Sequence, residues 1–317
     1  IPRRQRQMCI RDRLLTMMAI MNRNQELPKY KADLYQNSSE LLLKWDVERA
    51  LRREGIEQIN LDSIEIKDKQ EILRRMANFM QENKEGKSGN LISENDVERI
   101  IKEYLDFLGF KDAIIIARAL VKELRNRNFI LCSVGGGYYA FVHRAFLEYF
   151  CAWSFAWKFK ETQSLNIDEL INDVFGSHWR DEKWHEILRL IAGMIHPNFV
   201  KKILSYLIEK DGEEEKFMNL FLAGKCLFEV AHPQHIDEIA SELLNRLKAL
   251  TNYNLDNIDY DSEIRTQAVT VVAETWRNNR LTKTEIKTWL NHLAESHNDL
   301  NVRERAREEL AIGWKND

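Results

Sequence analysis

Two histidines and two glutamates lie close together in the segment HWRDEKWHE at residues 178–186, and these residue types bind transition metals in proteins. The four are His178, Glu182, His185 and Glu186. On a helix, however, positions 178 and 185 are two turns apart, which is too far for neighbouring ligands of one ion. The H-E-x-x-H order is also absent, because position 189 is arginine. The segment therefore predicts a surface helix start with its two tryptophans, Trp179 and Trp184, turned inward, and no metal site.

Gly86-Lys87-Ser88 resembles the end of a phosphate-binding P-loop. The complete motif needs a glycine five positions before Gly86, where this sequence has Gln81. It also needs a preceding strand and a following helix, because loop amides and a helix N-terminus together hold the phosphates. A helix is expected before this segment, so we interpret it as a connection between helices. The sequence contains no Walker A motif.

One histidine has a more specific setting, at the start of the segment Phe141–Phe150, FVHRAFLEYF. His143 follows a β-rich run and precedes a helix whose Phe146, Tyr149 and Phe150 are spaced to pack inward. A histidine there is more commonly a capping or core residue. An imidazole at a strand–helix junction can also donate a hydrogen bond to a phosphate, since helix starts favour anions. Both interpretations of His143 remain open on the residues alone.

The elements around His143 follow a particular order. Residues 68–82 and 93–108 have helical periodicity, and Ser93 with Asp96 predicts the start of the second helix. A third helix is expected near 112–126, carrying Ile115, Ala119 and Leu124. Two β-rich runs then flank Gly135-Gly136-Gly137, which predicts a hairpin. Three helices followed by a hairpin is the order of a winged-helix domain.

A winged helix can bind DNA with its third helix, and four basic residues lie on or beside that helix: Arg118, Lys122, Arg125 and Arg127. Asp112 and Glu123 reduce the positive charge of this helix, and the expected hairpin that follows it is not rich in basic residues. The formal net charge of the chain is −3, so nothing holds it on nucleic acid through overall charge. Nucleic acid is therefore not expected as a partner.

Beyond residue 165 the pattern is helical throughout, and it repeats near the end. Asp261–Ala268 aligns with Asp299–Ala306 as D-x-x-[IV]-R-x-x-A, at an offset of 38 residues. Repeats of this period resemble HEAT repeats. In this interpretation the aspartate caps the helix start, the alanine permits close packing, and the arginine bridges to the neighbouring repeat. Glu213-Glu214-Glu215 predicts a solvated first helical turn.

The composition agrees with a mainly helical protein. Among 317 residues only 12 are glycine and 4 are proline, the residues on which turns depend most. A sandwich or barrel of many short strands would need more of them. Four cysteines far apart in the sequence, without a C-x-x-C, suit a reducing compartment and exclude a zinc ribbon. The longest apolar runs are far shorter than the roughly 20 residues that span a bilayer, so no membrane partner is expected.

Residues 1–13 are expected to be foreign to the protein. Arg3–Asp12 reads RRQRQMCIRD, which resembles a translation of the transposon-end adapter used to prepare sequencing libraries. Cys9 and the basic cluster would then have no biological role, and the natural chain would enter near Leu14. Without these residues the net charge becomes more negative, which further disfavours a DNA-binding function.

The segment F-V-H-R-A-F-L-E-Y-F resembles the F-x-H-x-x-F-x-E-[YF] segment of NACHT-type NTPases, which belong to the STAND class of signal-transduction proteins. Residues 14–18 (LLTMM), 26–28 (ELP) and 34–35 (LY) resemble the helical domain that follows their nucleotide-binding core. The resemblance extends over residues 14–317 and is strongest to bacterial, particularly cyanobacterial, members with C-terminal HEAT-like repeats.

Together with the element order, the resemblance implies a mainly α fold. Its expected parts are a helical domain at 14–60, a winged-helix domain with one β-hairpin at 61–157, a helical domain or degenerate repeats at 158–250, and HEAT-like α-solenoid repeats at 251–317. By the same resemblance, His143 would approach the β-phosphate of bound ADP and hold the resting state closed.

The resemblance also implies an ATPase parent that binds ATP or ADP with Mg²⁺, with its Walker A and Walker B segments upstream of Leu14. No cofactor and no hydrolysis are expected of this fragment alone. The expected partners are a protein trigger or ligand on the repeats and further copies of the activated parent, in the cytoplasm and in antiviral defence. Two alternatives remain: a helical-repeat interaction scaffold without a nucleotide switch, and a winged-helix DNA-binding regulator.

Overall fold

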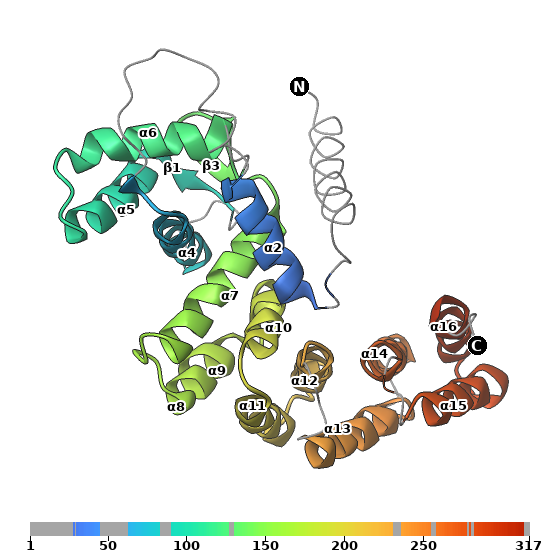
Figure 1. Ribbon diagram of the computed structural model, residues 1–317. Helices are drawn as coiled ribbons and strands as arrows, with labels where there is room; N and C mark the ends of the chain where they lie inside the picture. The colour runs from blue at the N-terminus through green and yellow to red at the C-terminus, as the bar shows by residue number, and fades with distance from the viewer. Residues whose placement is uncertain are drawn as a thin grey trace. The chain divides into compact units, whose positions relative to one another are not determined.

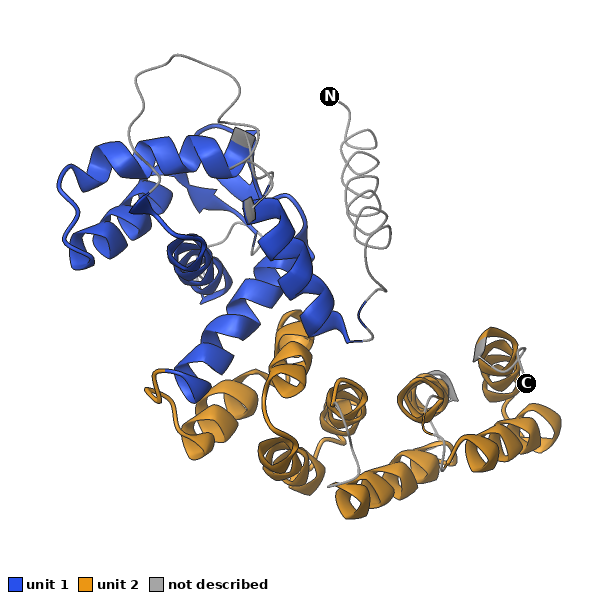
Figure 2. Ribbon diagram, in the orientation of Figure 1, with its two compact units in different colours: residues 1–161 blue, residues 162–317 orange. Residues whose placement is uncertain are grey.

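The chain forms two compact units, residues 1–161 and residues 162–317 (Figure 2). The computed structural model describes residues 28, 30–44, 63–82, 90–126, 130–230, 236–254, 258–277, 279 and 282–313. Within these ranges the chain is mainly helical with one small sheet, as its composition predicts. No helix among them is both long enough and apolar enough to cross a membrane. The predictions for residues 1–27, for Gly86-Lys87-Ser88 and for Arg127 lie outside the described residues.

Unit 1 combines helices with a three-stranded sheet (Figure 1). Helix α4 packs on α5 and α7, α5 packs on α6, and α2 contacts both α4 and α7. In chain order the described elements are α2 (Lys31–Lys44), α4 (Ile66–Glu82), β1 (Ile92–Ser93), α5 (Glu94–Phe107), α6 (Ala113–Asn126), β2 (Leu131–Gly135), β3 (Tyr138–Phe141) and α7 (Arg144–Lys160).

Strands β2 and β3 form the hairpin that the glycine triplet predicts. Gly135, Gly136 and Gly137 have φ angles of 93°, 62° and 72°, a region that L side chains rarely adopt. A further strand, β1, pairs antiparallel with β3 and gives the sheet the order β1-β3-β2. The prediction of a single hairpin is therefore incomplete, because a two-residue strand is too short to show alternation in the sequence.

Helix α5 begins where the sequence predicts. The Ser93 hydroxyl accepts a hydrogen bond from the Asp96 amide at 3.1 Å, which satisfies one of the free donors at the helix start. The predicted apolar face is buried at Val97, Ile100, Ile101, Tyr104 and Leu105. The buried face ends at Leu105, since Leu108 at the C-cap is 41% exposed.

The buried face of α6 differs from the prediction. Ile115 is 50% exposed, although it was expected to face the core. Leu124 is buried as expected, and the other buried positions of this face are Ala117, Leu120 and Val121. Three consecutive isoleucines at 114–116 cover almost the whole circumference of the helix, so the sequence does not determine which of them faces inward.

Aromatic side chains of α7 form the core of unit 1. Phe146, Tyr149 and Phe150 are at most 2% exposed, as their spacing predicts. Tyr35 of α2 packs against Phe146 with ring centroids 6.3 Å apart, and Phe141 of β3 packs against Phe150 at 5.9 Å. Such ring pairs each stabilise a core by about 0.5–1.5 kcal/mol beyond their buried area. They fix α7, and with it the strand–helix junction at its start.

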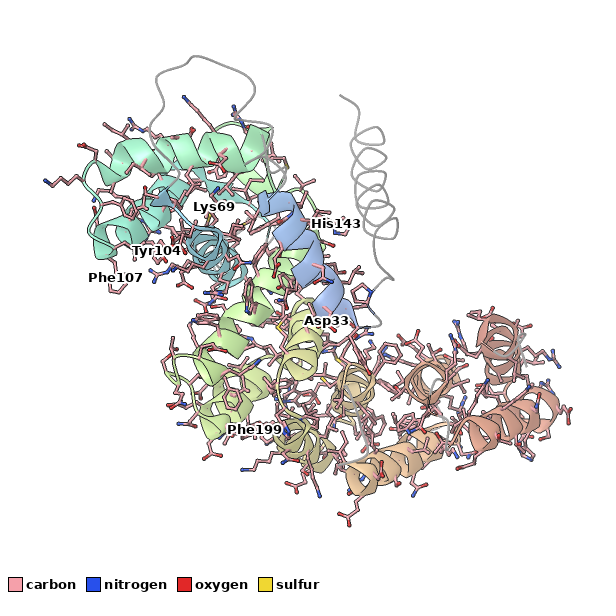
Figure 3. The ribbon with its side chains drawn as sticks, viewed as in Figure 1. Asp33, Lys69, Tyr104, Phe107, His143 and Phe199 are labelled. Atoms are coloured by element: carbon pink, nitrogen blue, oxygen red, sulfur yellow. The ribbon has the colours of Figure 1, made fainter. Side chains whose placement is uncertain are left out.

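Buried polar groups connect α4 to α5 and α6. The Lys69 ammonium lies 2.5 Å from a Glu123 carboxylate oxygen, and the two side chains are only 7% and 11% exposed (Figure 3). The Tyr104 hydroxyl donates to Asp68 at 2.8 Å. Burial raises the pKa of the Tyr104 hydroxyl, and its bond to the Asp68 carboxylate raises that pKa further. These charges are paired inside the unit, where an unpaired one would be costly.

Unit 2 is entirely helical in its described residues. It begins with a continuous helical segment formed by α8 (Ile167–Glu169), a π-helical turn η2 (Leu170–Phe175) and α9 (Gly176–His178). The helices that follow are α10 (Glu182–Met194), α11 (Pro197–Glu209), α12 (Met218–Phe228), α13 (Asp237–Leu250), α14 (Ile258–Trp276), α15 (Lys283–Ser296) and α16 (Leu300–Gly313).

The helices of unit 2 alternate between two layers. Consecutive helices pack as the pairs α11–α12, α13–α14 and α15–α16. Helix α14 also packs on α12 and on α16, and α11 contacts α13. Figure 1 shows α12, α14 and α16 in one row and α11, α13 and α15 in another. Each pair thus buries its apolar residues partly against the next pair.

The two sequence repeats occupy equivalent places in neighbouring pairs, on α14 and α16. Arg265 of α14 forms an ion pair with Asp299, which directly precedes α16, at 2.9 Å. This is the bridge between repeats that the sequence predicts. The apolar positions of the motif are 0% exposed in both copies: Ile264, Ala268, Val302 and Ala306.

The expected capping role holds for only one of the two aspartates. Asp299 accepts a hydrogen bond from the Asn301 amide at 2.8 Å at the start of α16. Asp261 lies inside α14, which begins at Ile258, and is 1% exposed, so the prediction that it caps that helix is wrong. The additional turn of α14 moves the helix start ahead of the motif.

The acidic triplet at 213–215 precedes α12 instead of forming its first turn. Lys216 and Phe217 have left-handed φ angles of 54° and 59°, which prevents the helix from starting earlier. Tyr253 holds this segment, because its hydroxyl donates to Glu213 at 2.7 Å and its ring lies 5.0 Å from that of Phe217. The prediction for the triplet fails because contacts distant in sequence determine the backbone here.

Candidate functional site

His143 lies at the junction of β3 and α7 in unit 1 (Figure 3). It is the N-cap of α7, with extended backbone angles (φ −129°, ψ 131°). Its Nδ1 accepts a hydrogen bond from the Ala145 amide at 3.2 Å. The capping interpretation of the sequence is therefore confirmed, and this bond defines the protonation of the ring.

An Nδ1 atom that accepts from an amide carries no hydrogen, so the neutral ring carries its hydrogen on Nε2. Burial also lowers the pKa of His143 below its ordinary value of 6.5, which favours the neutral form. The result is an uncharged imidazole that presents one N–H donor away from the helix. Such a donor fits an oxygen acceptor, including a phosphate oxygen.

Other histidines of the chain show how the second ring nitrogen is commonly used. His297 caps the turn before α16 in the same way, accepting from the Asp299 amide at 3.1 Å, and its Nε2 lies 2.9 Å from the Thr251 carbonyl oxygen. The Nε2 of His185 lies 2.7 Å from the Trp179 carbonyl oxygen. Within the described residues, the Nε2 of His143 has no such partner in the chain.

The charged residue next to His143 is paired within the chain. Arg144, the next residue, pairs with Glu148 at 2.7 Å along the surface of α7. Its charge is thus already partnered one turn further along the helix. The site as described consists of one oriented N–H donor at a helix start, where the helix dipole favours a negatively charged ligand.

In the segment 178–186 the two tryptophans face inward, as predicted. His178 stacks on the Trp184 ring with centroids 3.7 Å apart, and Trp179 and Trp184 are 1% and 5% exposed. The Nε2 of His185 bonds the backbone, as stated above. Over the part of the chain that the structure describes, no group of three or more histidine, cysteine, aspartate or glutamate side chains is placed to hold a metal ion.

The basic residues considered for DNA binding are partly engaged within unit 1. Arg118 lies 3.2 Å from a Glu98 carboxylate oxygen. Arg125 contributes an interaction to Tyr139 on the sheet. Lys122 is exposed on α6. Two of the three described basic residues are thus engaged within unit 1.

Unit 2 contains a large groove that the sequence analysis did not predict. Its volume is about 1130 Å³, and it lies where the α13–α14 turn meets the α15–α16 turn. Its lining includes Asn245, Asn252, Trp289, Asn298 and Leu300. A signal was present in the polar runs TNYN at 251–254 and SHNDLN at 296–301, but only the pairing of helices brings them together.

Compared with known proteins, the chain matches no family model, no curated protein and no solved structure.

Proposed function

We propose that this chain is the regulatory and sensor portion of a NACHT-type signal-transduction NTPase, a nucleotide-gated switch in bacterial defence or stress signalling. In this proposal α4, β1, α5, α6 and the β2–β3 hairpin form a winged-helix domain. The helix pairs from α11 onward are HEAT-like repeats. The parent protein would act in the cytoplasm and oligomerise when activated.

The setting of His143 carries the proposal. The motif F-x-H-x-x-F-x-E places this histidine at a strand–helix junction, and its capping bond leaves a neutral ring with its N–H on Nε2. A neutral donor at a helix start suits a phosphate oxygen of ADP. In the resting parent, that contact would hold the winged-helix domain against the nucleotide, and exchange of ADP for ATP would release it.

Hydrolysis is assigned to the parent and not to this chain. The printed sequence contains no G-x-x-x-x-G-K-[ST], and a single imidazole does not form a phosphate cradle. In the parent, bound ATP or ADP with Mg²⁺ would supply the phosphoryl chemistry. The role of His143 is limited to one hydrogen bond from Nε2 that senses the nucleotide state.

The test compares two substitutions of His143 in the parent reading frame recovered from its source DNA. His143→Asn keeps an N-cap acceptor, since asparagine is among the best capping residues, but removes the second donor. His143→Ala removes both. A hydrogen bond to a charged group contributes about 1.5–3 kcal/mol, so both variants should bind ADP roughly ten- to a hundredfold more weakly.

Thermal unfolding of the same variants separates binding from folding. Only His143→Ala should lower the stability, by about 1 kcal/mol, the usual effect of losing a cap. His196 offers a matched control, because it also caps a helix, through an Nδ1 that accepts from the Asn198 amide at 3.3 Å. His196→Asn should leave ADP affinity unchanged. Unchanged ADP affinity in His143→Asn, or an upstream frame without a P-loop, would refute the switch.

The alternative is a helical-repeat interaction scaffold without a nucleotide switch. The observation in its favour is that the capping bond already accounts for His143 without any ligand. Ion pairs between neighbouring helix pairs, such as Lys248 with Glu285 at 2.6 Å, also suit a rigid scaffold. In that case the parent frame would contain no nucleotide core, and both His143 variants would differ only in stability.

A further inference from the structure

Several polar residues that line the groove in unit 2 already have their hydrogen-bond partners within the chain. Arg265 pairs with Asp299 and also donates to the Tyr253 carbonyl oxygen at 2.6 Å. His297 joins the two turns through the Thr251 carbonyl oxygen. Burial alone would raise the pKa of Asp299, but hydrogen bonds from Ser262, the Asn301 amide and Arg265 outweigh it and hold that pKa below its usual value. An ion pair and hydrogen bonds within the chain therefore connect α14 with the two turns at the groove.

Charges at the groove are neutralised within the chain. The Arg265 and Asp299 side chains are 14% and 13% exposed and face each other. Lys248 is paired with Glu285, and its ammonium lies 5.6 Å from the Trp289 ring centre. A strongly charged ligand would therefore find no free counter-charge among these groups. The groove favours a ligand of low net charge.

The groups that remain available are amides and apolar surfaces. Asn245, Asn252 and Asn298 are exposed, and their side-chain amides make no hydrogen bond within the described part of the chain. Each amide offers both a donor and an acceptor. Trp289 is half-buried and Leu300 is 64% exposed, which gives the groove apolar contacts beside its amides.

The position of these amides suits a polypeptide main chain. Asn252 and Asn298 directly follow Thr251 and His297, and the His297 Nε2 lies 2.9 Å from the Thr251 carbonyl oxygen, so the two asparagines belong to turns that are in contact. Peptide groups present the donor and acceptor pairs that side-chain amides complement.

We propose that the groove between the α13–α14 and α15–α16 turns binds an extended, weakly charged polypeptide segment of a partner protein. Asn252 and Asn298 hold its main chain, and Trp289 with Leu300 receives an apolar side chain. Within the proposed switch this segment is the trigger, and only that biological role rests on the proposed function. Binding itself requires neither His143 nor a nucleotide.

The probe is a phage-displayed library of random linear peptides selected on the full chain. Selected sequences are then synthesised with a fluorophore, and their affinity is measured by fluorescence anisotropy. The variants are Trp289→Ala and the double change Asn252→Ala with Asn298→Ala. Asn291→Ala is the matched control, because Asn291 is an exposed asparagine on α15 outside the groove.

We expect enriched peptides with a recurrent apolar position, bound about tenfold or more weakly by each groove variant and equally well by the control. Added salt should change the affinity little, since the charges of the groove are paired. Thermal unfolding of each variant reports whether it still folds, which matters most for Trp289→Ala because Trp289 is half-buried, whereas Asn252 and Asn298 are exposed.

Three outcomes would overturn the proposal. In the first, no peptide is enriched on the wild type relative to the double variant. In the second, the enriched peptides bind the wild type and the groove variants equally well. In the third, no peptide binds, and the chain instead binds an immobilised oligosaccharide in a way that depends on Trp289. Peptide binding without a P-loop in the parent frame would instead refute the switch and leave the groove assignment intact.

Discussion

The close contact between α12 and α14 can be tested at a single glycine. Gly224 is buried in α12, and a Cβ added there would lie 2.4 Å from Val271 Cγ1 of α14. Contacts of Cβ atoms below 3.0 Å are essentially never observed, so the helices would have to separate. The Thr275 hydroxyl, which donates to the Gly224 carbonyl oxygen at 3.1 Å, would move with α14.

Two opposing terms determine the stability of Gly224→Ala. Alanine in a helix interior is favoured over glycine by about 1 kcal/mol. Overpacking of a well-filled core costs about 1–3 kcal/mol. The net expectation is a loss of roughly 0–2 kcal/mol, whereas the same change in open space would stabilise the protein. Urea unfolding followed by circular dichroism measures the difference.

A second substitution isolates the cause. Val271→Ala removes the atom that the new Cβ would meet, so Gly224→Ala should be neutral or stabilising in that background. Gly176→Ala is a control, because its Cβ would chiefly meet the hydroxyl end of the Tyr206 side chain, at 2.6 Å, which can rotate away. If Gly224→Ala alone stabilises the protein by about 1 kcal/mol, the two helices do not approach as closely as described.

Three further predictions concern buried and titratable groups. Lys69→Ala should lower the unfolding free energy by about 3–5 kcal/mol because it leaves the Glu123 charge unpaired, whereas Lys69→Met with Glu123→Leu should cost much less in the same urea assay. The thiols of Cys151 and Cys226 are 0% exposed and burial raises their pKa, to about 12 for Cys226, so mass-spectrometric mapping should find both unalkylated by iodoacetamide until the chain unfolds. The pKa of His143 is lower in the folded chain than in the unfolded chain, so its contribution to the free energy of unfolding is complete above pH 6.5 and is lost as the pH falls toward the folded pKa. In His143→Asn the free energy of unfolding, measured with urea over this pH range, should therefore change less with pH than in the wild type.

Local signals in the sequence predict those elements that local physics determines. The Ser93 cap, the glycine triplet of the hairpin and the aromatic spacing of α7 each act within a few residues, and each is found where expected. The bridge from Arg265 to Asp299 was also predictable, because a repeat places equivalent residues on neighbouring helices.

Features that depend on distant contacts were not predictable in this way. Strand β1 exists because β3 pairs with it, and the left-handed Phe217 is held by Tyr253. The groove forms only because two turns, about 46 residues apart in sequence, are brought together by the pairing of helices. No local periodicity reports such a juxtaposition.

The two interpretations of His143 are compatible, because one supports the other. A cap alone is served as well or better by serine, threonine, aspartate or asparagine. Imidazole differs from these in carrying a second nitrogen on the far side of a rigid ring. The capping bond from Ala145 fixes which nitrogen holds the hydrogen, and thereby turns Nε2 into a donor of defined direction. In His297 that second donor meets a carbonyl oxygen of its own chain, which shows that this geometry can position a hydrogen bond across a junction. At the start of α7 the described residues provide no such acceptor, and in the proposed switch this donor would bond a phosphate oxygen of the nucleotide.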